Sequence, residues 1–88
     1  MKLKPGFKVA EVAGDWILVP LGDEMTRFNG TVALNEVAAF LMNQLKSERT
    51  EQELVSLLTD EYDVDPETAR KDVRLAIEKM REIGVIDE

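Results

Sequence analysis

The sequence contains no cysteine and no histidine. The first absence excludes a disulfide framework, a thiolate nucleophile and any metal held by cysteine, and the second removes the side chain most often used as a general base. Carboxylates, Lys, Ser, Thr and Tyr62 remain for catalysis, and no pair of them stands out. A small carboxylate-dependent enzyme is therefore the weakest hypothesis. We assign no catalytic residue, no metal ligand and no cofactor.

Other signals are also missing from the 88 residues. No apolar run approaches the ~20 residues of a membrane span, and Met1 to Phe7 is too short and too charged for a secretion signal, so we expect a cytoplasmic protein without a membrane partner. The glycines stand singly in turn contexts and form no phosphate-binding loop. The formal charge of −7 opposes nucleic acid unless basic groups gather locally. Length and composition predict a single domain over residues 1–88.

The first third of the chain predicts a small antiparallel sheet. Phe7 to Val12 and Trp16 to Val19 flank the turn residues Ala13-Gly14-Asp15, which indicates a β-hairpin that ends near Pro20. A third strand is expected loosely within Thr26 to Ala33, with Met25 to Phe28 either an extended loop or the start of that strand. The segment Lys2 to Gly6 is interpreted as a solvated lead-in.

Three amphipathic helices are expected to follow. Asn35 is the predicted N-cap of the first, Thr50 and Glu53 have capping-box spacing at the second, and Asp65 precedes a proline suited to the first turn of the third. Gly84 fits the left-handed position after the third helix. The predicted fold class is α+β and winged helix-turn-helix-like, with a three-stranded antiparallel sheet followed by three helices (β-β-β-α-α-α). The predicted core stripe of the third helix is Ala69, Val73, Ala76, Ile77, Met80 and Ile83.

One positive stripe stands out against the acidic background. Arg70, Arg74, Ile77 and Arg81 are spaced to lie along one flank of the third helix. One interpretation is a solvated face on which the arginines pair with nearby acids such as Glu67 and Glu78. The other is a groove for an acidic partner, because a guanidinium binds carboxylates bidentately. The third strand has a similar double interpretation, since an edge strand is either protected or a template for an extended peptide.

Several short segments combine in a fairly specific order and spacing. They are Leu18-Val19-Pro20, Phe28-Asn29-Gly30, Leu34-Asn35-Glu36 with Ala38 and Phe40-Leu41, Arg49-Thr50, Glu61-Tyr62-Asp63-Val64, Asp72-Val73 and Ile83-Gly84. Over nearly its whole length the chain resembles the PqqD-like family. That resemblance implies a winged helix-turn-helix-like recognition element, a peptide-binding chaperone that holds the leader of a ribosomally made precursor peptide for a partner enzyme, often a radical-SAM one.

The resemblance also implies where the leader would bind, namely along the edge of the third strand in a groove bordered by the third helix. The chain departs from the family's usual residues at Met42, at Lys46-Ser47 and at the small Ala76. We expect no catalysis and a monomer or weak homodimer, and the alternative function is a winged-helix DNA-binding regulator. The peptide-binding residues carried over are Phe28, Asn29, Gly30, Thr31, Val32, Arg70, Arg74, Ile77 and Arg81.

Overall fold

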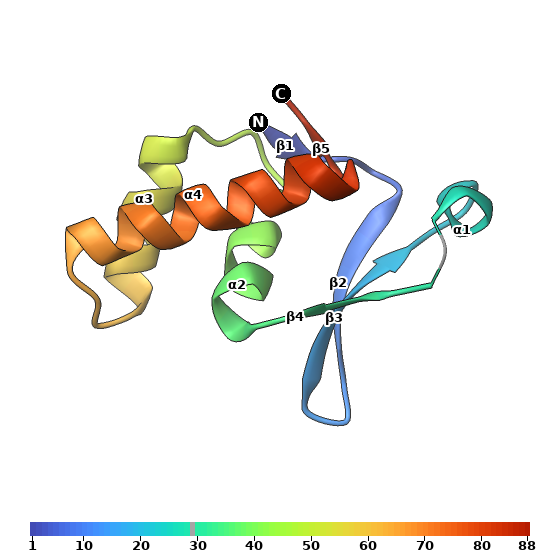
Figure 1. Ribbon diagram of the computed structural model, residues 1–88, viewed down its shortest axis with the longest axis horizontal. Coiled ribbons are helices and arrows are strands. Elements are labelled where there is room, and N and C mark those ends of the chain that lie inside the picture. The colour runs from blue at the N-terminus through green and yellow to red at the C-terminus, as the bar shows by residue number, and fades with distance from the viewer. Residues whose placement is uncertain (29) are drawn as a thin grey trace.

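Within residues 1–28 and 30–88, a three-stranded antiparallel sheet and four helices form a mixed α+β domain, as the sequence predicts at the level of fold class, but the element order differs from the predicted β-β-β-α-α-α. The computed structural model describes residues 1–28 and 30–88, so the predicted site residue Asn29 lies outside the described residues. Figure 1 shows the sheet beside α2, with α4 extending past both α2 and α3. In chain order the elements are β1 (Lys2–Leu3), β2 (Phe7–Val12), β3 (Asp15–Pro20), α1 (Glu24–Arg27), β4 (Val32–Leu34), α2 (Glu36–Gln44), α3 (Glu51–Glu61), α4 (Pro66–Ile83) and β5 (Ile86–Asp87).

The predicted hairpin is confirmed. β2 and β3 pair antiparallel, from Phe7 opposite Pro20 to Val12 opposite Asp15. The two residues of the loop both have positive φ, 54° at Ala13 and 86° at Gly14. This is the requirement of a two-residue type I′ turn, whose twist matches that of the flanking strands.

β4 is an edge strand of this sheet. It pairs antiparallel with β3, from Val32 opposite Leu18 to Leu34 opposite Trp16. The sheet order is β2-β3-β4, so the outer edge of β4 has no strand beside it among residues 1–28 and 30–88. The unpaired backbone groups of such an edge can hydrogen-bond another chain.

Both interpretations of Met25 to Phe28, as an extended loop or as the start of the third strand, were wrong. Glu24–Arg27 forms the helix α1, and the Phe28 amide closes its turn by donating to the Glu24 carbonyl at 2.8 Å. The strand begins only at Val32. The helix α1 buries no residue and therefore has no apolar stripe at helical spacing. For this reason the sequence pattern did not predict it.

The three predicted helices begin as expected. The Asn35 side chain accepts a first-turn amide of α2, and Thr50 and Glu53 form the reciprocal capping box of α3. The Asp65 side chain caps α4, which ends at Gly84 with φ 75°. These local signals fix the helix boundaries because each satisfies backbone groups that the helix leaves unpaired.

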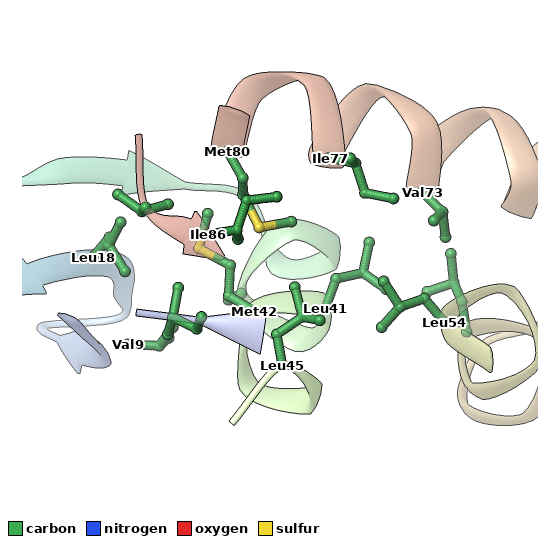
Figure 2. Packing of buried hydrophobic residues seen from close by; sticks show 14 of the residues in the cluster. Val9, Leu18, Leu41, Met42, Leu45, Leu54, Val73, Ile77, Met80 and Ile86 are labelled. Carbon is green, nitrogen blue, oxygen red and sulfur yellow. The ribbon is translucent and has the colours of Figure 1, made fainter. Parts of the chain in front are cut away.

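One apolar core joins the helices to the sheet. Val73 and Ile77 of α4 point toward Leu41 of α2 and Leu54 of α3 in Figure 2. Leu18 of β3 is fully buried in the same cluster. Each fully buried aliphatic side chain contributes about 1.5–3 kcal/mol of hydrophobic free energy, so this shared core fixes how α4 lies relative to the sheet.

The interpretation of Lys2 to Gly6 as a solvated lead-in was wrong. β1 pairs antiparallel with β5, Lys2 opposite Asp87 and Leu3 opposite Ile86, and Leu3 is only 6% exposed. Figure 1 shows the two strands together at the N- and C-terminal ends. Strands of two residues are too short to show alternation, and their partner lies at the opposite end of the sequence.

Candidate functional site

An open groove of about 350 Å³ lies between β4, one side of α2 and one side of α4. It follows the edge strand described above, so the unpaired edge and the groove belong to one surface. Its lining residues are Val32, Ala33, Leu34 and Asn35, then Val37, Ala38 and Met42, and from α4 Asp72, Leu75, Ala76, Lys79 and Ile83.

The groove is mainly apolar. Ala38 and Ala76 contribute small side chains from α2 and α4, and Met42 beside them is 1% exposed. Leu75 is the opposite case, since 58% of it is exposed although it is a large apolar residue on the groove wall. Small residues leave space and the exposed leucine offers surface that a ligand could cover, a combination typical of binding grooves.

Two charged residues interrupt the apolar wall of α4. Asp72 and Lys79 both line the groove, and neither forms an ion pair with any residue that the structure describes. Charged side chains beside apolar surface interact strongly with a ligand that displaces water from them. The groove therefore offers both shape and charge.

The predicted arginines lie away from this groove. Arg74 follows Asp72 by two positions and Arg81 follows Lys79 by two, and two residues turn a helix by about 200°. Arg74 Nη2 instead contacts Glu51 Oε2 of α3 at 3.0 Å. The side of α4 that carries the arginines thus faces α3 and solvent, because the groove side is almost diametrically opposite.

Arg81 forms an ion pair with Glu88. Its Nε and Nη2 donate to the two carboxylate oxygens of Glu88 at 2.8 and 2.6 Å. The hydrogen bond to Glu88 raises the pKa of Arg81, and the same bond lowers the pKa of Glu88. A guanidinium paired in this bidentate way presents less positive charge to a phosphate or to an acidic peptide.

Arg70 lines a second depression of about 340 Å³ on the outer face of α4, and Leu75 lines both this depression and the groove. Arg74 also lines the depression, together with the acids Glu67 and Glu78. Because acidic and basic side chains lie together here, this surface is not a purely positive stripe. The pairing expected with Glu67 and Glu78 is replaced at Arg74 by the contact with Glu51.

Ile77 is buried and is therefore not accessible beside the arginines. It is 1% exposed and points into the core, where Figure 2 shows it above Leu41. The placement of Ile77 beside a bound peptide is therefore corrected: the exposed apolar residue of α4 is Leu75. Spacing alone did not separate the two, because Ile77 fits both the core stripe and the arginine spacing.

The predicted peptide-binding residues from Phe28 to Val32 lie in different environments. Val32 is in β4 and lines the groove, whereas Gly30 and Thr31 are exposed and precede the strand. Phe28 is half-buried and packs edge-on against Phe7, with ring centroids 5.2 Å apart. Of the predicted site residues that the structure describes, only Val32 lines this groove.

Sequence reasoning missed most of the groove. A usable signal was present in α4, where Asp72, Leu75 and Lys79 recur at helical spacing beside the predicted core stripe. Leu75 lies outside the predicted core stripe, which left a large apolar side chain without a packing role. An apolar arc wider than the core requires is typical of a helix with a second partner.

The segment before α4 is acidic, with Asp60, Glu61, Asp63 and Asp65 in its sequence, and Asp65 caps the helix. Asp65 Oδ1 accepts the Thr68 amide at 2.8 Å, and Oδ2 accepts the Thr68 hydroxyl at 3.1 Å. Within residues 1–28 and 30–88, no three acidic side chains converge as a cation site would need. In the same residues, no helix has the length and apolar content to cross a membrane.

Fold and groove together define a class of small α+β domain in which a sheet edge stays open along a helix-walled groove. The chain belongs to the PqqD family, whose description is coenzyme PQQ synthesis protein D and which matches residues 15–86. The match includes β3, β4, the helices α1 to α4 and every residue that lines the groove, whereas β1 and β2 precede it.

Two solved structures share the fold. TbiB1 in complex with the TbiA(beta) leader peptide has a TM-score of 0.75 and 21% identity, with 99% of this chain and 95% of that chain covered. Lasso peptide synthetase B1 complexed with the leader peptide has a TM-score of 0.72 and 24% identity, with 96% and 93% covered. No curated protein sequence matches the chain.

Proposed function

We propose that this protein binds the leader segment of a ribosomally synthesised precursor peptide, which adds as an extended strand to the outer edge of β4. The observation that carries the proposal is that the unpaired edge of β4 lies along the apolar groove walled by α4. Family membership supports it, as do the two structures of similar fold, both of which are complexes with a leader peptide.

Binding energy in this arrangement comes from two sources. Each main-chain hydrogen bond to β4 contributes about 0.5–1.5 kcal/mol, and any peptide sequence can make it. A large apolar side chain that enters the groove over Ala38 and Ala76 contributes about 1.5–3 kcal/mol when fully buried. Because association and ordering of the peptide cost several kcal/mol, an edge without an apolar anchor would bind weakly.

In this proposal the protein does not catalyse a reaction. It is a winged helix-turn-helix-like domain that uses its sheet edge for a peptide and presents that peptide to a modifying enzyme of the radical-SAM type. DNA binding is disfavoured because Arg74 and Arg81 are already paired with Glu51 and Glu88 in a chain of net charge −7.

The proposal is tested by selecting a displayed library of short random peptides on the purified protein. Enriched peptides are then synthesised with one N-methyl group at each backbone position in turn, and the Kd of each is measured by fluorescence anisotropy. In an added strand, alternate amides face the partner edge. N-methylation should therefore weaken binding at every second position within the contacting segment. A loss of affinity without this period of two would contradict strand addition.

A further inference from the structure

The α4 wall of the groove carries an ordered pair of charges. Asp72 and Lys79 lie two turns apart, about 10.5 Å along the helix axis, with the apolar Leu75 and Ala76 between them. Asp72 is half-buried and Lys79 is exposed. Both lack an ion-pair partner within the described part of the chain, whereas Arg74 and Arg81 on the opposite flank are both paired.

The strand β4 and the helix α4, which border the groove, run in opposite directions. In Figure 1, α4 passes from its N-terminal end near α3 toward β5, while β4 runs the other way, toward the start of α2. A peptide that pairs antiparallel with β4 therefore runs parallel to α4. Its N-terminal part would lie nearer Asp72 and its C-terminal part nearer Lys79.

Strand geometry converts this arrangement into a sequence pattern. Side chains of alternate residues share one face, and residues four positions apart on a strand are separated by about 13 Å. The difference from the helical separation of about 10.5 Å is within reach of the flexible Lys79 side chain. Three successive residues on the face toward α4 would thus meet Asp72, the apolar wall and Lys79 in turn.

From this geometry we propose that the groove selects peptides by charge order, with a basic residue first, a large apolar residue two positions later and an acidic residue two positions after that. This inference rests on the proposed function and adds the chemical class of leader that the groove accepts. Asp72 meets the basic side chain, Lys79 meets the acidic one, and the apolar anchor covers Leu75 and Ala76. The reversed order places like charges together, which is strongly unfavourable in a partly desolvated site.

Two synthetic peptides with the same composition test the order directly. One carries Lys-Thr-Phe-Thr-Glu and the other Glu-Thr-Phe-Thr-Lys, each capped at both ends and flanked by threonines. We expect the first to bind at least about tenfold more tightly at low salt, and the preference to shrink as salt screens the charges. Their equal composition means that charge order is the main difference between them.

Substitutions in α4 then test whether Asp72 and Lys79 determine the preference for one charge order. The double variant Asp72→Lys/Lys79→Asp should reverse the preference between the two peptides. Because Asp72 is half-buried, Lys79→Glu serves as a second variant at an exposed position and should remove the preference by weakening the first peptide. Lys71→Glu makes the same change of charge on the outer face of α4 and should leave the preference unchanged.

The outcomes separate this inference from the proposed function. If the random library yields peptides that bind with a period of two but without the charge order, or if both synthetic peptides bind equally or not at all, the charge-order inference is overturned and strand addition stands. If the library yields no binding peptide, both are overturned. A preference that survives in the double variant would also overturn the assignment to Asp72 and Lys79.

Discussion

Replacing Ala76 by leucine should close the groove without disturbing the fold. Ala76 is half-buried and lines the groove together with Ala38 and Met42. A branched side chain at this position occupies the space into which a peptide's apolar anchor would enter. Leucine is also a good helix former, so α4 itself should tolerate the change.

The magnitude follows from the buried surface that the peptide would lose. An aliphatic or aromatic anchor contributes about 1.5–3 kcal/mol when fully buried, so excluding it from the groove should raise Kd roughly ten- to hundredfold. Ala76 also packs against the core, so we expect the larger side chain to change the free energy of unfolding by no more than about 1–3 kcal/mol, the usual effect of overpacking. Titration calorimetry with a library-selected peptide and thermal unfolding by circular dichroism measure the two effects.

Ser56→Leu is the matched control, because it introduces the same side chain at an exposed position of α3 away from the groove. It should leave Kd within about twofold of the wild-type value. The reasoning is refuted if Ala76→Leu is folded and binds as tightly as the Ser56→Leu control, since the groove would then contribute nothing to binding.

Three further predictions concern residues outside the groove. Arg74→Glu should change Kd by less than about threefold, because it breaks only an exposed ion pair with Glu51. A tenfold loss of affinity by calorimetry would show that the arginines of α4 do contribute to peptide binding. Ile77→Ala should lower the free energy of unfolding by about 2–5 kcal/mol in urea, whereas a surface position would lose far less. Hydrogen bonds from the Thr68 amide and hydroxyl lower the pKa of Asp65, so the ionised carboxylate favours the folded state above its ordinary pKa, and that stabilisation is lost as pH falls through the lowered value. Asp65→Asn keeps a cap but cannot titrate, so its urea midpoint should fall less steeply in acid, and an unchanged acid dependence would contradict this role.

The parts of the fold that the sequence predicted correctly are those fixed by local physics. Asn35, Thr50 and Asp65 each satisfy amides of their own helix, and the Ala13-Gly14 turn needs only its own backbone angles. Such signals act over a few residues, so they can be recognised without knowledge of tertiary structure. The family resemblance, carried by the order of several segments, is confirmed by the match over residues 15–86.

The parts that were missed depend on long-range contacts. β1 and β5 pair although they lie at opposite ends of the sequence, and no local pattern predicts a strand of two residues. The site shows the same limit: the spacing of Arg70, Arg74 and Arg81 is evident, but which side of α4 faces β4 is set by the core around Ile77. Only after that core is known does the groove side, with Leu75 exposed, become identifiable.

The most direct measurement of strand addition is an isotope-filtered nuclear Overhauser experiment on labelled protein with an unlabelled, library-selected peptide. Antiparallel addition brings the backbone protons of the peptide close to those of Val32, Ala33 and Leu34 in an alternating pattern. We predict these cross-strand contacts, together with contacts from one apolar peptide side chain to Leu75 and Ala76. Contacts confined to the arginine side of α4, or a bound peptide with no backbone contact to β4, would contradict the proposal.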